Sequence, residues 1–185
     1  MRLSTSTIRT AIAMTAGALA PLAPVFAHEV DEYIQSTLIS LEKDHLDVQM
    51  RLVPGVDVFP QVLAQIDRNE DGLISDAEKQ AYARAVLRDL TFSMNGRRAA
   101  AEIVSAKFPS IELMKEGLGE IQLALHLPIT NPAEHQKLVL ENRHQPAISA
   151  YLVNCLKPLD PSIHIVSQHR SADQSRYELS YETGG

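Results

Sequence analysis

The sequence predicts an α+β protein, an antiparallel β-sandwich with a helix–loop–helix inserted between its strands. Apolar and polar residues alternate over residues 46–52 and 121–127, and this period of two is typical of half-buried strands. Between these segments, residues 57–90 change to helical spacing. Turn residues such as Asn131-Pro132 separate the later segments. Strands on both sides of one helical hairpin therefore favour a sandwich with an insertion.

The first 27 residues have the pattern of a secretory signal peptide. Two arginines precede an Ala-rich apolar run over residues 10–23, and Val25 and Ala27 supply short side chains where a signal peptidase reads the chain. We therefore expect cleavage after Ala27 and a periplasmic or secreted location. The mature chain would start at His28 and form a single β-rich domain over residues 28–183.

The charge and cysteine content of the mature chain limit the classes of partner and the disulfides that we expect. Without Arg2 and Arg9, the 17 basic residues fall to 15 against 23 acidic ones, a balance of −8 with histidine neutral. An acidic protein is a poor match for nucleic acid or anionic membrane surfaces. No later run reaches the roughly 18 apolar residues of a spanning helix, so no membrane span is expected. The one cysteine, Cys155, can form no intramolecular disulfide and is predicted to be buried in a strand.

Short strands are predicted on both sides of the helical segment. A turn at Lys43-Asp44 joins the first two strands, and Pro54-Gly55 ends the second. Asn95-Gly96 is the expected two-residue turn of a hairpin that begins near Phe92. The strands predicted from alternation or β-branched content cover residues 37–41, 46–52, 103–108, 121–127, 138–142, 150–156, 163–169 and 177–181.

Residues 57–90 are predicted to form two amphipathic helices around a polar loop. In the first helix, apolar residues recur at helical spacing, and Asp57 is the expected N-cap. The second helix should run from Ser75 to about Leu90. Ser75 and Glu78 have the spacing of a capping box, in which each residue satisfies a backbone N–H of the other.

The loop between the helices carries a specific motif. Residues 67–78 read Asp-Arg-Asn-Glu-Asp-Gly-Leu-Ile-Ser-Asp-Ala-Glu and match the calcium-loop pattern D-x-[DN]-x-[DN]-G-x5-E at every fixed position. Calcium prefers roughly six to eight oxygen ligands. The expected ligands are the side chains of Asp67, Asn69 and Asp71, the backbone carbonyl of Leu73, Ser75 directly or through a water, and both oxygens of Glu78. Gly72 permits the sharp turn, and Ile74 is expected to point into the core.

Over residues 57–90 the chain therefore resembles the EF-hand family, which implies a bound Ca²⁺. An Asp-rich surface turn that binds nothing would need neither Gly72 nor Glu78 at those offsets. EF-hands usually occur in pairs, but no second loop is found in the sequence, so Ile74 should pack on the sheet or pair with a second copy. In an exported protein, even a site of about 10⁻⁴ M stays filled. We expect a largely structural calcium in a binding or interaction module.

A broader resemblance covers most of residues 28–182. The stretches that carry it are residues 31–35, 52–56, 141–143 and 151–154, together with the calcium loop. They are similar to the extracytoplasmic N-terminal domain of bacterial membrane proteins related to the nickel permeases that serve hydrogenase and urease. The multi-helix membrane part of that family is missing from this sequence. The resemblance thus implies at most a free-standing relative, with a protein partner or a membrane transporter beside it.

A transition-metal site is the alternative function. After cleavage, His28 would offer an α-amine and an imidazole, a pair that binds copper or nickel. The further histidines are His45, His126, His135, His144, His164 and His169. Alternation predicts that His45, His126 and His164 face solvent, and no two histidines are expected to form a close pair at metal-ligand spacing.

No enzyme activity and no catalytic residue is expected. The sequence contains no G-x-S-x-G, H-E-x-x-H or P-loop pattern. An enzyme would instead be indicated by a deep pocket that is lined with titratable groups and lies away from the calcium loop.

Overall fold

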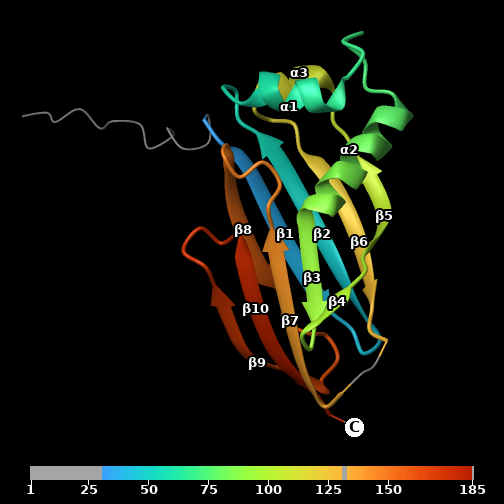
Figure 1. The fold of residues 1–185 in the computed structure, drawn as a ribbon, viewed down its shortest axis with the longest axis vertical. Coiled ribbons are helices and arrows are strands. Elements are labelled where there is room, and N and C mark those ends of the chain that lie inside the picture. Colours follow the sequence, from blue (N-terminus) through green and yellow to red (C-terminus); the bar gives the residue numbers. More distant parts are fainter. Residues whose placement is uncertain (1–30, 131–132, 185) are drawn as a thin grey trace, which may run out of the picture.

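The computed structural model describes residues 31–130 and 133–184. These residues form two five-stranded sheets, with the helices gathered at one end of the sheets (Figure 1). The signal peptide predicted over residues 1–27 and the expected new N-terminus, His28, lie outside the described residues.

The ten strands divide into two sheets. The first sheet contains β1 (Tyr33–Leu41), β2 (His45–Pro54), β5 (Glu102–Lys107), β6 (Ile121–Pro128) and β8 (Ser149–Cys155), in the order β5-β6-β2-β1-β8. The second sheet contains β3 (Leu90–Met94), β4 (Arg97–Ala99), β7 (His135–Asn142), β9 (Ile163–Arg170) and β10 (Arg176–Thr183), in the order β4-β3-β7-β10-β9.

Alternation along each strand decides which side chains enter the core. In β2, Leu46 and Val48 are buried, whereas Asp47 and Gln49, which alternate with them, are exposed. The same alternation buries every second residue of β6 and β10. The strands predicted from the sequence are all present, and the α+β class is confirmed.

One strand pairing departs from the antiparallel arrangement that we predicted. β1 and β8 run parallel, with Tyr33 opposite Ser149 and Ile39 opposite Cys155, while the other pairings of the described strands are antiparallel. Parallel neighbours need a long connection, and the strands and helices between β1 and β8 supply it. Alternation reports the buried face of a strand but not the direction of its neighbour, so the prediction was wrong here.

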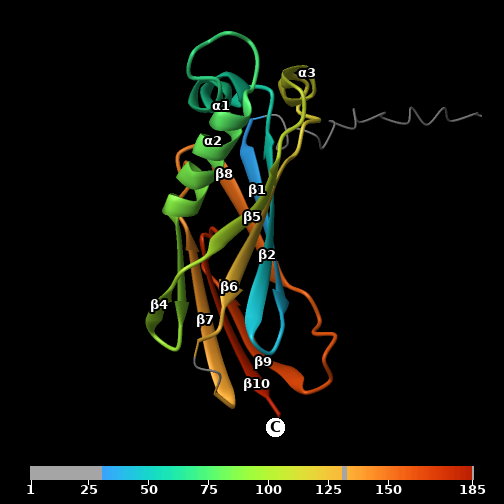
Figure 2. The same cartoon turned by 90° about the vertical axis from the view of Figure 1, so that its right-hand side faces the viewer.

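The helix–loop–helix predicted over residues 57–90 is present. α1 (Phe59–Ile66) and α2 (Asp76–Asp89) lie at one end of the sheets (Figures 1 and 2). The capping box at the start of α2 is confirmed. The expected N-cap of α1 is wrong, because Val58 occupies that position with a helical backbone and no side-chain hydrogen bond. A turn over residues 56–58 leads directly into the helix, so no separate capping residue is needed.

A third helix, α3 (Ile111–Lys115), was not predicted. It has five residues and begins at Ser110, whose side chain accepts a hydrogen bond from the N–H of Leu113. Five residues are too few to show a helical period, so only the cap could have indicated it.

One hydrophobic core connects the two sheets and the helices. Leu125 of the first sheet, Leu179 of the second sheet, and Ile66 and Val86 of the helices all belong to the same buried cluster. Figure 2 shows the sheets as two layers with the helices at their ends. Cys155 is buried as predicted, and burial raises the pKa of its thiol to about 11. The helical hairpin is therefore part of the folded core rather than an appendage.

Candidate functional site

The loop between α1 and α2 turns sharply through two left-handed residues. Asp67 ends α1, and its N–H donates to the carbonyl of Leu63 at 2.8 Å. Glu70 and Gly72 have φ angles of 58° and 75°. Glycine adopts this conformation without steric cost, which agrees with the role predicted for Gly72.

The first three predicted ligands lie in one hydrogen-bonded turn. The carboxylate of Asp67 accepts from the N–H of Gly72 at 3.0 Å and, more weakly, from the N–H of Asp71 at 3.3 Å. The amide of Asn69 donates to a carboxylate oxygen of Asp71 at 2.8 Å, and the other oxygen accepts from the N–H of Leu73 at 2.9 Å. The sequence spacing thus brings the oxygens of Asp67, Asn69 and Asp71 into one turn.

Glu78 connects the two ends of the loop. One carboxylate oxygen accepts from the N–H of Arg68 at 3.1 Å. The other accepts from the N–H of Ser75 at 2.9 Å and from its hydroxyl at 2.7 Å. The hydrogen bonds with Ser75 hold the pKa of Glu78 below its usual value. This carboxylate is therefore ionised at neutral pH and spans the loop from its start to the first turn of α2.

The three carboxylates predicted as ligands are not paired with a cationic side chain in the described part of the chain. Among residues 31–130 and 133–184, no Lys, Arg or His forms an ion pair with Asp67, Asp71 or Glu78. Asp67 is only 5% exposed, and a buried carboxylate is costly without a compensating charge. Three carboxylates together with amide and hydroxyl oxygens make a hard donor set, which suits Ca²⁺ rather than a softer metal.

The two apolar residues of the loop have opposite environments. The side chain of Leu73 is 69% exposed, so only its backbone is available as a ligand. Ile74 is partly buried and packs against the hydrophobic core. Of the two arrangements that the sequence allows for Ile74, the structure contains packing within its own chain.

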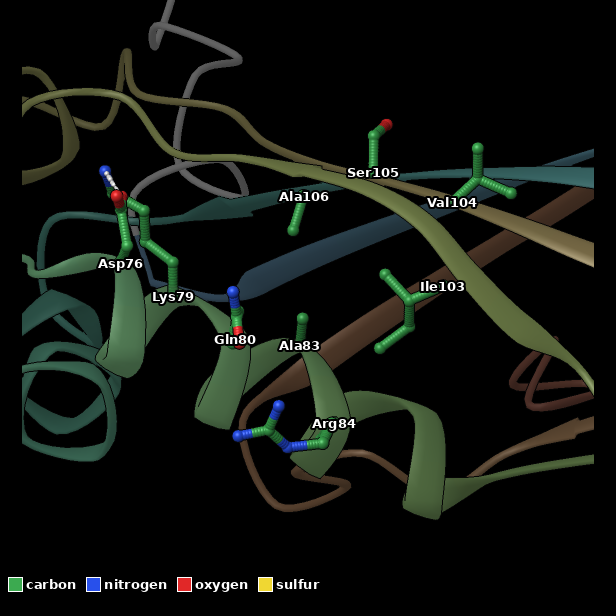
Figure 3. Close-up of a pocket in the computed structure, with 9 residues that line it drawn as sticks. All are labelled: Asp76, Lys79, Gln80, Ala83, Arg84, Ile103, Val104, Ser105 and Ala106. Atoms are coloured by element: carbon green, nitrogen blue, oxygen red, sulfur yellow. Dashed lines mark hydrogen bonds and ion pairs between the residues drawn. The ribbon is translucent and has the colours of Figure 1, made fainter.

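A groove lies beside the loop, between α2 and β5. It has a volume of about 510 Å³ and is lined by residues such as Gln80, Arg84 and Ile103 (Figure 3). Asp76 and Lys79 form an ion pair of 2.9 Å at one end. The groove is open and shares α2 with the loop, so it is not the separate deep pocket that would indicate an enzyme. The absence of enzyme activity stays a prediction.

A buried polar network attaches α2 to the sheets, and it was not predicted from the sequence. The Tyr82 hydroxyl lies 2.7 Å from the Tyr33 hydroxyl and 3.1 Å from Nε2 of His144. Nδ1 of His144 lies 2.7 Å from a carboxylate oxygen of Asp89. Because the carboxylate can only accept, Nδ1 carries the proton, Nε2 accepts from Tyr82, and Tyr82 accepts from Tyr33.

Further hydrogen bonds hold His144 in place. Its carbonyl accepts from Gln35 and Tyr151, both at 2.9 Å, and its N–H donates to the side chain of Asn142 at 2.9 Å. Burial lowers the pKa of the His144 imidazole, although its bond to Asp89 acts in the opposite direction. Nothing in the sequence distinguishes this histidine from the exposed ones, so its role emerges only from the fold.

The other histidines of the described residues lie at the surface, and two of them depart from our prediction. His164 is exposed as expected. His45 and His126, however, do form a close pair: their ring centroids are 4.7 Å apart, and Asp47 lies within reach of both. Among the described residues, His45, Asp47 and His126 are the one group of three possible metal ligands whose donor atoms all lie within 4.8 Å of one another. The prediction was wrong because β2 and β6 are distant in sequence but adjacent in the sheet.

Comparisons with family models, curated proteins and solved structures found no match. Over the residues that the structure describes, no helix combines the length and the apolar character that a membrane crossing requires.

Proposed function

We propose that this protein is an exported calcium-binding protein in which a single EF-hand, residues 67–78, holds one Ca²⁺ within a β-sandwich. The donors are Asp67, Asn69, Asp71, the Leu73 carbonyl, Ser75 and Glu78. The observation that carries the proposal is that the three predicted ligand carboxylates lie in one loop, with no cationic side chain of the described residues paired to them. A divalent cation would supply the missing charge and relieve their mutual repulsion.

The calcium is proposed to be structural. α2 begins at the loop and contributes buried residues to the core that both sheets share. Fixing Glu78 would therefore fix the start of a helix whose far end is already attached to the sheets. A module held in this way would serve binding or interaction, with a protein partner or a membrane transporter as the expected partner. Export follows from the leader pattern, with cleavage after Ala27.

The test is a calcium titration by calorimetry on untagged protein without the leader. Wild type is compared with Glu78→Gln and with Glu70→Gln, which removes a charge from the same loop at a position that supplies no ligand. We expect a one-site isotherm in wild type and in Glu70→Gln, and loss of the heat in Glu78→Gln. Equal binding in all three proteins, or no heat in magnesium-free wild type, would refute the site.

A periplasmic transition-metal accessory protein that uses His28 and other histidines remains the alternative from the sequence. His28 lies outside the described residues, so no contact of its side chain supports that function. Calcium binding is preferred because the hydrogen bonds among the loop residues support it.

A further inference from the structure

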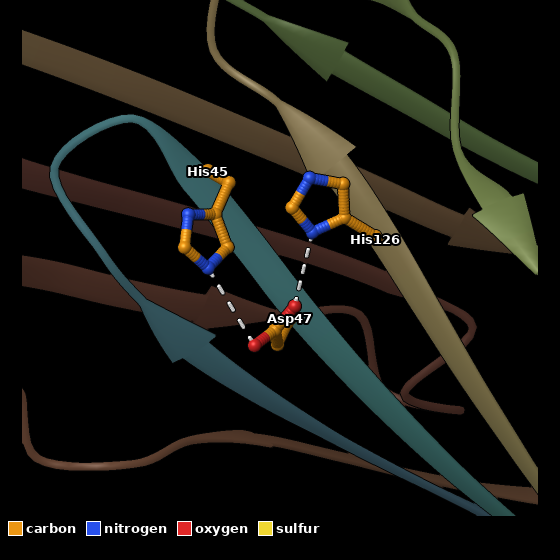
Figure 4. A group of neighbouring side chains, drawn as sticks. All are labelled: His45, Asp47 and His126. Carbon is orange, nitrogen blue, oxygen red and sulfur yellow. Dashed lines mark hydrogen bonds and ion pairs between the residues drawn. The ribbon is translucent and has the colours of Figure 1, made fainter. Parts of the chain in front are cut away.

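We propose that His45, Asp47 and His126 form a second metal site, for a borderline divalent transition metal such as Zn²⁺. The site lies on the outer face of the first sheet and comes from two neighbouring strands (Figure 4). It is independent of the calcium loop and of the proposed function above.

The sheet register brings these side chains together. Asp47 and His126 are direct partners across the antiparallel pair of β2 and β6, and His45 precedes Asp47 by two residues on the same face of β2. Directly opposite residues have Cβ atoms about 5 Å apart. β2 is hydrogen-bonded to β1 on one side and β6 on the other, so the three side chains project from a rigid part of the sheet, as a preorganised site requires.

Two of the distances between donor atoms are close to those around a tetrahedral ion. Nδ1 of His126 lies 3.2 Å from one carboxylate oxygen of Asp47, and Nε2 of His45 lies 3.6 Å from the other. Zinc–ligand bonds of about 2.0–2.1 Å place the ligands of a tetrahedral ion about 3.3 Å apart. The 3.2 Å contact is also a hydrogen bond, whereas 3.6 Å is too long for one. All three donor atoms lie within 4.8 Å of one another, and both imidazoles face the one carboxylate (Figure 4).

A fourth residue orients one of the ligands. Nδ1 of His45 lies 2.6 Å from a carboxylate oxygen of Asp44, which leaves Nε2 of His45 directed toward Asp47. Metal-binding histidines commonly donate their other ring nitrogen to a carboxylate in this way, which fixes the tautomer and strengthens the ligand. Asp44 is therefore assigned as a positioning residue rather than a ligand.

The donor set and its exposure define the class of metal. Two imidazole nitrogens and one carboxylate oxygen suit Zn²⁺, Ni²⁺ or Cu²⁺ and are a poor set for Ca²⁺, which prefers oxygen alone. The side chains of His45, His126 and Asp47 are 28%, 37% and 51% exposed. Three protein ligands on an open face leave one position to water, as in exchangeable sites rather than closed structural ones.

The second site lies far from the calcium loop. His45 and Asp47 are at the start of β2, and α1 follows shortly after the end of that strand. At about 3.3 Å per residue, a ten-residue strand spans roughly 30 Å. The two sites can therefore be tested separately.

The experiment is a Zn²⁺ titration by calorimetry with calcium present throughout, so that the loop is not available to zinc. All proteins lack the leader and any affinity tag and carry His28→Ala, which removes the amine–imidazole pair. The His28→Ala protein with no further change, the background protein, is compared with His126→Asn, Asp47→Asn and Asp44→Asn. The matched control is His164→Asn, an exposed histidine on the other sheet, and the melting temperature of each variant without zinc verifies its folding.

We expect one zinc equivalent in the background protein and in the His164→Asn control. His126→Asn and Asp47→Asn should lose it, and Asp44→Asn should bind roughly 10–100-fold more weakly, as is typical for loss of an orienting partner. Absence of zinc binding in the background protein, or an unchanged equivalent in His126→Asn, would overturn the proposal.

Discussion

Replacing Tyr82 by Phe removes one hydroxyl from the buried network that attaches α2 to the sheets. Tyr82 is 2% exposed, and its hydroxyl contacts the Tyr33 hydroxyl and Nε2 of His144 at 2.7 and 3.1 Å. Tyr33 is fully buried, so the substitution leaves its O–H without an acceptor and leaves Nε2 without its principal donor. We expect the free energy of unfolding to fall.

The magnitude follows from the number of groups that lose a partner. Each buried donor or acceptor left unsatisfied costs about 1–3 kcal/mol. The two groups here are the Tyr33 hydroxyl and Nε2 of His144. Because the variant no longer buries the Tyr82 hydroxyl, part of this cost is recovered, and the net loss of stability is about 2–3 kcal/mol. For a protein of this size, that loss corresponds to a melting temperature lower by roughly 5–10 °C.

Tyr181→Phe is the matched control, because Tyr181 is equally buried but differently bonded. It is 1% exposed, and its hydroxyl finds no hydrogen-bond partner among the described residues. Removing an unpaired buried hydroxyl should leave stability unchanged or raise it. The assay is thermal and urea unfolding of both variants by circular dichroism. Equal losses of stability in the two variants would show that the network around Tyr82 adds nothing beyond ordinary packing.

Three further predictions concern calcium, backbone strain and pH. At free calcium about 100 times the dissociation constant, the ion should raise the free energy of unfolding by about 2.7 kcal/mol. A melting temperature that a chelator leaves unchanged would contradict a structural calcium. Gly72 and Gly96 both have positive φ, with nothing near an added Cβ, so replacing either by Ala should lower the free energy of unfolding by about 1 kcal/mol. Only Gly72→Ala should also weaken calcium binding, which calorimetry would detect. Because burial lowers the pKa of His144, the unfolded chain binds its proton first, so stability should fall as pH drops below the ordinary value of 6.5. An NMR titration in which the pKa of His144 is equal to or higher than that of the exposed histidines would refute this prediction.

Local patterns in the sequence were sufficient for the strands and the helical hairpin. The alternation in β2 and β6 reports burial of one face, and burial is decided residue by residue. The residues proposed to bind calcium likewise follow one another along the chain, so their spacing alone was enough to predict them. Both kinds of prediction depend on neighbours within one element or one loop.

Long-range neighbours could not be predicted in the same way. Asp47 and His126 are 79 residues apart in sequence and become adjacent only through the register of β2 and β6. Asp89 and His144 are 55 residues apart and meet because α2 ends against the segment that follows β7. The parallel pairing of β1 and β8 belongs to the same class, since no feature of either strand specifies its partner's direction.

The attachment of α2 argues for a structural calcium over a calcium switch. Glu78 and Tyr82 are one helical turn apart, and Asp89 ends the same helix. Opening the hairpin on calcium binding would separate Tyr82 from Tyr33 and Asp89 from His144, and it would leave buried groups unpaired at about 1–3 kcal/mol each. That cost is of the same order as the roughly 2.7 kcal/mol that the ion supplies at 100 times its dissociation constant. Calcium that holds α2 in its present position keeps both pairs intact and carries no such cost, so a structural role is favoured over a switch.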